Sequence, residues 1–146
     1  MALPASASDA AATKSLTIRV YVDEVTQSIK DVPPKTLNIG YYTKGDTIRG
    51  TDVLRNALPQ FDRPEGAVVG TDRYVKIAVA SQTISFDFVA SLPGGTVHAH
   101  AEGKIGSAPR LPIVGGTGRY AGATGVVEGL HLANGKKVNI YRLQTP

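Results

Sequence analysis

The stretch that decides the fold is residues 111–125, which read LPIVGGTGRYAGATG. It holds five glycines, and three of them fall within positions 115–118. Glycine is used where the backbone takes a positive φ, or where another segment approaches more closely than a Cβ would permit. Strand-like residues lie on both sides, at 110–114 and 125–132. The stretch therefore predicts a tight corner between two strands, which is typical of a sheet that bends to close a barrel.

A phosphate-binding loop is the alternative for the same glycines, because Gly116-Thr117-Gly118 and Gly122 superficially match one. A dinucleotide-binding fingerprint requires a helix after the glycines, with its N-terminus directed at the pyrophosphate. The residues that follow, 121–125, are poor helix formers, and no Gly-Lys-Ser/Thr follows them. The corner is the favoured interpretation.

The rest of the chain is a series of short alternating segments with almost no helical pattern. The expected strands are residues 15–25, 47–54, 67–80, 84–90, 96–104, 110–114, 126–132 and 138–143, with an ambiguous segment at 35–42. Pro93-Gly94-Gly95 and Asn134-Gly135 are hairpin turn signals. Sequential strands joined by tight turns predict an antiparallel sheet that forms a sandwich or closes into a barrel, and closure removes exposed edges. We predict an all-β fold, a small up-and-down barrel of about eight strands, whose interior has room for side chains or one small ligand.

Composition limits the class of protein. The chain has 146 residues and no cysteine, with a net charge of +4. We expect a disordered leader over residues 1–13 and a single barrel domain over 14–146. The basic residues are scattered, which argues against nucleic acid as a partner. No apolar run is long enough to span a membrane, and residues 1–13 make a poor signal peptide, so we expect a cytoplasmic protein.

Three polar side chains on one face of a strand raise the question of a metal site. His98, His100 and Glu102 alternate along residues 96–104, and ligands at i and i+2 can share a metal, as they do in cupins. The alternative is that they line the exposed face, opposite Val97 and Ala99, and we favour that alternative. No Gly-x-Ser-x-Gly elbow is present, so a hydrolase is poorly supported.

The corner also carries a resemblance to a known family. A proline and two aliphatic residues followed by GGTG, with an aromatic residue close behind, resemble the signature of the dirigent and allene oxide cyclase barrel superfamily. Gly45-Asp46-Thr47-Ile48 and residues 95–103 extend the resemblance, which spans roughly 16–143. The length is similar to that of small bacterial members, several of which are natural-product cyclases such as spirotetronate-type Diels–Alderases.

The resemblance implies a cofactor-free cyclase, without a metal, that works as a homodimer or homotrimer. Such a barrel holds a small apolar or polyene substrate of polyketide type in an apolar lumen and directs an intramolecular cyclisation, such as a [4+2] cycloaddition. The physical basis is proximity, because freezing internal rotations lowers the barrier. Plant allene oxide cyclases carry a first-strand glutamate near the position of Val22 here, so their cyclopentenone chemistry is in doubt. A non-catalytic ligand-binding barrel and a dirigent-like protein remain alternatives.

The alternation of the strands gives candidate site residues. Glu24 continues the inward row of the first strand and His131 alternates with Val127 and Gly129, so these two are the candidate catalytic residues, although Glu24 equally fits a solvated strand end. Tyr21 and Tyr74 lie opposite the aliphatic rows of their strands and are expected outside. The predicted substrate-lining residues are Val20, Val22, Tyr41, Ile77, Phe86, Phe88, Tyr120 and Tyr141.

Overall fold

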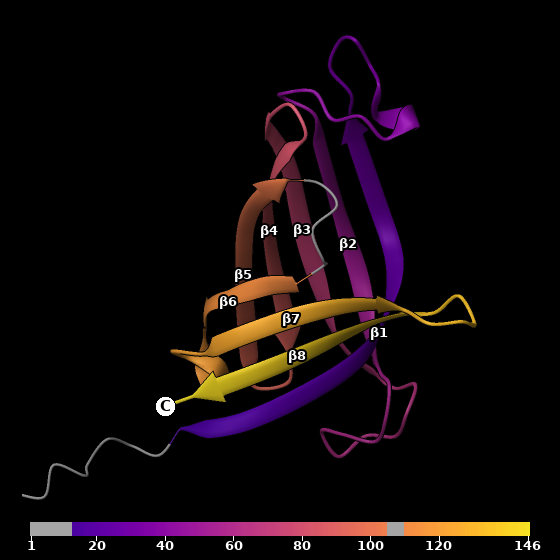
Figure 1. Ribbon diagram of the computed structural model, residues 1–146. Helices are drawn as coiled ribbons and strands as arrows, with labels where there is room; N and C mark the ends of the chain where they lie inside the picture. The colour runs from indigo at the N-terminus through magenta and orange to yellow at the C-terminus, as the bar shows by residue number, and fades with distance from the viewer. Residues whose placement is uncertain (1–12, 105–109) are drawn as a thin grey trace, which may run out of the picture.

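The chain folds as the sequence predicts. In residues 13–104 and 110–146, which the computed structural model describes, eight strands form a closed antiparallel barrel (Figure 1). The strands are β1 (Lys14–Lys30), β2 (Thr47–Asn56), β3 (Val68–Ala80), β4 (Thr83–Leu92), β5 (Gly95–Lys104), β6 (Arg110–Gly116), β7 (Thr124–His131) and β8 (Lys137–Thr145). Each strand pairs with the next in sequence, and β1 closes the barrel by pairing with β8. The predicted leader, apart from Thr13, lies outside the described residues.

The ambiguous segment at 35–42 is not a strand. It forms part of a long connection between β1 and β2 that includes the short 3-10 turn η1 (Leu37–Ile39). The buried carboxylate of Asp46 organises this connection, because its two oxygens accept hydrogen bonds from the backbone N–H groups of Val32 at 2.8 Å and Thr43 at 2.7 Å.

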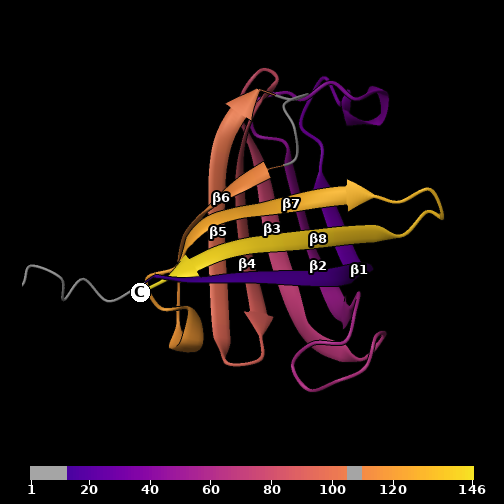
Figure 2. The same ribbon diagram turned by 60° about the horizontal axis from the view of Figure 1, so that its bottom comes forward.

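Strand β1 is long because it serves both edges of the closed sheet. Its first part pairs with β8 and its second part with β2, and the register with β2 shifts between Glu24 and Thr26. A bulge bends a strand and offsets its alternation by one residue. Figures 1 and 2 show the bend, with the first part of β1 running beside β8 and the second part rising beside β2. The offset explains why both Glu24 and Gln27 line the interior, although they are three residues apart.

The glycine corner is present and fixes the β4–β5 hairpin. The 3-10 turn η2 (Gly118–Tyr120) packs on the hairpin, where the Arg119 N–H donates to the carbonyl of Gly94 at 2.9 Å. The hydroxyl of the fully buried Tyr120 donates to the carbonyl of Pro93 at 2.7 Å. Gly118 has φ +59°, and a Cβ there would lie 2.2 Å from the oxygen of Gly94. The corner thus requires glycine for both its conformation and its closeness to the hairpin.

A Gly118→Ala variant should lose about 3 kcal/mol of unfolding free energy, because it combines the cost of a left-handed conformation with a backbone clash. Gly135→Ala is the matched control, since Gly135 has φ +83° but an added Cβ would meet nothing within 4 Å. The control should lose about 1 kcal/mol. Urea unfolding of both variants measures the difference, and equal losses would show that the contact with the hairpin contributes nothing.

The solid core fills the end of the barrel that the corner closes. The largest fully buried side chains there include Ile18, Leu54, Val97, Tyr120 and Tyr141. The opposite end, where the β1–β2 connection and the β3–β4 and β7–β8 turns lie, is open to a cavity. The closed end therefore supplies most of the packing, and the open end supplies the space for a ligand.

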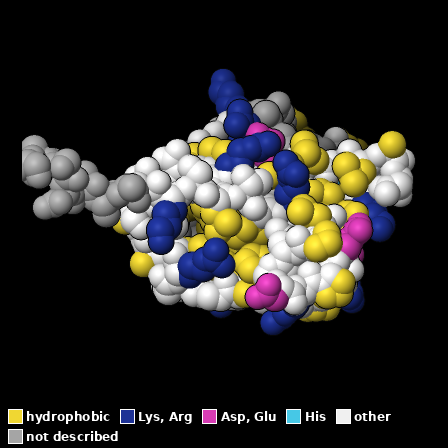
Figure 3. Space-filling view, turned by 90° about the horizontal axis from the view of Figure 1, so that it is seen from below, with side chains coloured by type: hydrophobic (Ala, Val, Ile, Leu, Met, Phe, Trp, Pro, Cys, Tyr) yellow, Lys and Arg dark blue, Asp and Glu magenta, His cyan; other side chains and the backbone are white. Residues whose placement is uncertain are grey.

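The outer surface carries dispersed basic residues. The face seen in Figure 3 shows Lys and Arg side chains in several separate places, with hydrophobic and uncharged surface between them. Among the described residues, no helix has the length and apolar character needed to cross a membrane.

Candidate functional site

A cavity of about 500 Å³ occupies the open half of the barrel. This volume is within the range of small-molecule sites. Inward-facing side chains of all eight strands and one residue of the β1–β2 connection, Tyr42, form its lining. Its lining includes Glu24, Gln27, Asp52, Tyr74, Lys76, Ile84, Phe86, Phe88, Ala101, Gly103, Arg110, Leu111, Val127, Gly129, His131, Lys137 and Asn139.

One wall of the cavity is apolar. Strand β4 contributes Phe86 and Phe88, as predicted, together with Ile84. Leu111 of β6 and Val127 of β7 continue this wall, and the small residues Ala101 and Gly129 leave it uncrowded. Such a surface suits a flat or conjugated ligand, because large apolar side chains provide contact area without charge.

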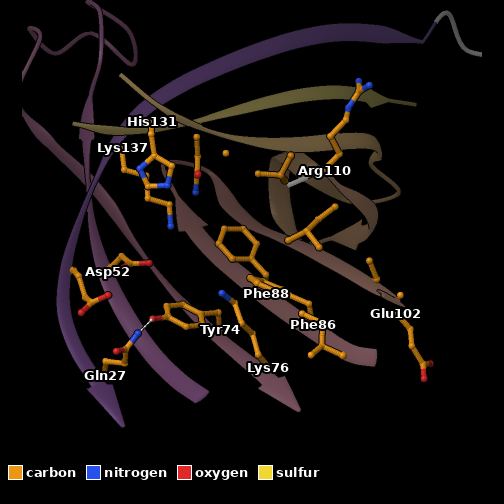
Figure 4. A pocket seen from close by; sticks show the side chains of 18 of the residues that line it. Gln27, Asp52, Tyr74, Lys76, Phe86, Phe88, Glu102, Arg110, His131 and Lys137 are labelled. Carbon is orange, nitrogen blue, oxygen red and sulfur yellow. Dashed lines mark hydrogen bonds between the residues drawn. The ribbon is translucent and has the colours of Figure 1, made fainter. Parts of the chain in front are cut away.

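The facing wall is polar, which corrects the prediction of an apolar lumen. Strands β1, β2, β3 and β8 present carboxyl, amide, hydroxyl and amino groups to the same space (Figure 4). The amide nitrogen of Gln27 donates to the hydroxyl of Tyr74 at 3.2 Å. The cavity can therefore hold the apolar body of a ligand on one side and hydrogen-bond to its polar atoms on the other.

The two faces of β3 are the reverse of the prediction. Ile77 points outward and is 38% exposed, whereas Tyr74 and Lys76 point into the cavity. The aliphatic row of a strand is expected to face inward only where the interior is an ordinary hydrophobic core. The inward side of β3 instead borders a polar site. Gly50 is the residue in the sequence that indicates the inward position of Tyr74, because glycine within a strand often marks a close approach by another group. A Cβ on Gly50 would lie 2.3 Å from the Tyr74 ring, which rests over it.

A Gly50→Ala variant should push the Tyr74 ring into the cavity and break its hydrogen bond with Gln27. We expect binding of a neutral fluorescent probe, phenylnaphthylamine, to weaken about tenfold, because overpacking removes ligand volume. Gly103→Ala is the control, since Gly103 also lines the cavity but an added Cβ would meet nothing within 4 Å. Fluorescence titration of both variants checks this, and equal affinities would contradict it.

Lys76 lies along the aromatic side of the cavity. Its amino nitrogen is 5.0 Å from the centre of the Phe86 ring and 5.7 Å from that of Tyr74. Cation–π contacts at such distances stabilise an ammonium group. Burial, and next the charge of Lys137, lower the pKa of Lys76 below its usual value, while Asp52 and Glu24 act in the opposite direction.

Two carboxyl groups lie side by side at the inner end of the polar wall. Asp52 of β2 and Asp72 of β3 are direct partners across the two strands, with only 5% and 3% of each residue exposed. Asp52 lines the cavity, whereas Asp72 lies behind it. Burial first, and then the hydrogen bond with Asp52 and its charge, raise the pKa of Asp72 to about 9, although the charge of Lys137 acts in the opposite direction.

The pair shares a proton at neutral pH. Among the described residues, no N–H or hydroxyl donates to either oxygen of Asp72, which disfavours a carboxylate there and agrees with its raised pKa. Two buried like charges in contact cannot both be ionised without a large cost. Because Asp52 faces the cavity and Asp72 lies behind it, a bound ligand would meet the carboxyl group of Asp52. The sequence indicates this pair only through the position of each aspartate on an inward row: Asp52 alternates with Leu54 on β2, and Asp72 alternates with Tyr74 on β3.

The predicted catalytic residues fall within the site. Glu24 and His131 both line the cavity, Glu24 from the bulged part of β1 and His131 from the end of β7. Figure 4 shows His131 beside Lys137 on one side of the cavity. A chemical role for either residue stays a prediction.

The other predicted lining residues are placed differently. Val20, Val22, Tyr120 and Tyr141 belong to the buried core and are not among the side chains that line the cavity. Tyr41 is 47% exposed and its hydroxyl hydrogen-bonds with that of Ser81 at 2.8 Å, while its neighbour Tyr42 reaches the cavity. The sequence could not locate the boundary between core and cavity, because both use the same inward rows.

The histidines of β5 lie on the outer face, as we favoured. His98 Nε2 is 2.9 Å and His100 Nδ1 is 3.3 Å from Oδ1 of Asp87 on β4. The hydrogen bond from His98 is the largest effect and lowers the pKa of Asp87; burial acts in the opposite direction, and the hydrogen bond from His100 adds to the lowering. In the part of the chain that the structure describes, no three His, Cys, Asp or Glu residues are grouped so that they could hold a metal ion. The cupin-like alternative therefore lacks its ligand set, since His131 lines the cavity from the exposed end of β7, away from the outer face that carries His98 and His100.

Comparisons with known proteins place the fold. No family model and no curated protein matches the chain by sequence. Among solved structures, a pyocyanin demethylase superposes with a TM-score of 0.70 at 20% identity, over 88% of this chain and 99% of the other. The exo-specific intermolecular Diels–Alderase AbnU gives 0.66 at 12% identity, over 91% and 98% of the two chains. The pterocarpan synthase dirigent protein GePTS1 gives 0.60 at 18% identity, over 90% and 87%. These likenesses confirm the predicted fold: the chain has the barrel that dirigent proteins share with bacterial Diels–Alderases.

Proposed function

We propose that this protein is a cofactor-independent cyclase, which folds a linear conjugated substrate in its cavity and directs an intramolecular ring closure. The observation that carries the proposal is the division of the cavity into an aromatic–aliphatic wall and a hydrogen-bonding wall. The names of similar barrels support it, because AbnU is a Diels–Alderase and GePTS1 is a pterocarpan synthase.

The two walls have different tasks. Phe86 and Phe88 hold the chain of the substrate in a compact conformation, so that the reacting carbons meet. When the carbonyl of the substrate binds beside Asp52, the proton of Asp72 passes to Asp52, and Asp72 is left as the carboxylate. Asp52 then donates a hydrogen bond from its cavity side to this carbonyl, which is conjugated with one reacting double bond. This withdraws electron density from that double bond and stabilises negative charge as it develops on the oxygen. A [4+2] cycloaddition is the ring closure that this arrangement favours, because it breaks no bond to a leaving group and needs no redox partner.

The first test compares extracts of the native producer with and without the gene by liquid chromatography and mass spectrometry. We expect the deletion strain to accumulate a linear compound, and the purified protein to convert it into a product of the same mass. Conversion would exclude the binding-only alternative. An unchanged metabolite profile, or binding of the linear compound without conversion, would overturn the cyclase proposal.

A further inference from the structure

Two lysines enter the cavity from opposite directions. Lys76 comes from the inward row of β3, and Lys137 is the first residue of β8. Figure 4 shows the amino ends of both side chains directed into the same space, next to Phe88. Their charges influence each other, since Lys137 lowers the pKa of Lys76.

Neither lysine is neutralised by a close carboxylate. The ion pairs within the described residues join Arg55 to Asp23, Asp87 to two histidines, and Glu128 to two arginines. Arg110, a further cation of the cavity lining, is occupied by Glu128 at 3.1 Å. Lys76 and Lys137 take part in none of these pairs. Glu24 and Asp52 act on Lys76 only through their more distant charges.

Lys76 is in an electrostatically unfavourable position without a ligand. It is half-buried and faces the charge of Lys137, which is itself exposed at the start of β8. Desolvation of the Lys76 ammonium group without a carboxylate partner has a cost. The proton shared by Asp52 and Asp72 also reduces the negative charge that the polar wall would otherwise carry. An anion placed between the two amino groups would relieve both effects.

We infer that Lys76 and Lys137 form an anion subsite, so the substrate carries a carboxylate or an enolate attached to its conjugated body. The inference rests on the proposed function only in that it takes the same cavity as the substrate site. The anion lies between the two amino groups, and the apolar body extends along Phe86 and Phe88. Charge-assisted hydrogen bonds to the two lysines fix which end of the substrate faces the mouth of the cavity.

Two fluorescent probes with the same ring system test this directly. Anilinonaphthalene sulfonate carries one negative charge, and phenylnaphthylamine lacks the sulfonate. The wild-type protein should bind the sulfonate at least about fivefold more tightly, and added salt should weaken only the sulfonate. Lys76→Met and Lys137→Met should each weaken the sulfonate about tenfold and change the neutral probe less than about twofold.

Lys136→Met is the matched control, because Lys136 neighbours Lys137 in sequence but its amino group lies 4.4 Å from the centre of the Tyr21 ring. It should change neither affinity. Unchanged binding of the neutral probe to a variant shows that the variant keeps an intact cavity. Equal affinity of the wild type for both probes, or an equal loss of both probes in Lys76→Met, would overturn the inference. The assay involves no turnover, so the anion subsite can be confirmed even if the protein does not catalyse cyclisation. Equally, the anion subsite can be refuted while the cyclase proposal stands.

Discussion

An Asp52→Asn variant should retain its fold and lose about a hundredfold in turnover of the linear substrate. Asparagine fills the same volume, but it cannot take up the proton of Asp72, so no proton can pass from the pair to the substrate. A positioned acid typically contributes a factor of this size. Substrate affinity should change far less, because the walls that fold the substrate remain. The measurement is single-turnover conversion of the linear compound, with affinity determined separately by titration.

Asp23→Asn is the control for this variant. Asp23 lies one residue before Glu24, but its exposed side chain pairs with Arg55 on the outer face of the barrel at 2.9 Å. Removal of this exposed ion pair should leave turnover unchanged and alter stability by less than about 1 kcal/mol. If Asp52→Asn turned over at the wild-type rate, the acid pair would have no part in the chemistry and shape alone would have to explain it.

The second large effect concerns stability and pH. The pKa of Asp72 is raised from its ordinary value of 3.8 to about 9 in the folded protein, so the folded state binds a proton that the unfolded state has released between these values. Stability therefore falls as pH rises from about 4 to about 9, by at most about 1.4 kcal/mol per pH unit. Asp72→Asn removes this proton uptake. The variant should gain up to about 4 kcal/mol relative to wild type when the pH is raised from 5 to 8.

Urea unfolding at several pH values checks this expectation. Asp23→Asn is again the control, because its exposed side chain pairs with Arg55, and a guanidinium keeps its charge throughout this range. The control should run parallel to wild type. If Asp72→Asn ran parallel as well, the pair would not hold a proton in the folded state, and its proposed role as an acid would fail with it.

The alternation of single strands predicted the barrel well, and it predicted the site only in part. The glycine corner and the turns at Pro93-Gly94-Gly95 and Asn134-Gly135 are local signals, so the closed antiparallel order followed from them. Phe86 and Phe88 were placed correctly because their strand has one plainly apolar row. On β3 both rows are mixed, and the rule that aliphatic residues face inward failed at Ile77.

The proximity of Asp52 and Asp72 could not be predicted from the sequence, for a different reason. Asp52 and Asp72 become neighbours only through the register between β2 and β3, which includes an irregularity near Leu54. A single sequence does not fix such a register. The same holds for Lys76 and Lys137, which are brought together by barrel closure rather than by any spacing along the chain.

The lengthwise division of the barrel has a consequence for evolution. The corner and its hairpin, with Tyr120 beneath them, stabilise one end, whereas the ligand cavity uses inward positions at the other. The two regions meet where the ring of Phe88, in the cavity wall, lies 6.2 Å from that of the buried Tyr141. Substitutions nearer the mouth, away from this contact, should combine additively with changes at the closed end. Residues near the mouth are therefore free to vary while the fold persists, in keeping with the similarity of this barrel to those of a demethylase, a Diels–Alderase and a dirigent protein at identities of 20% or less.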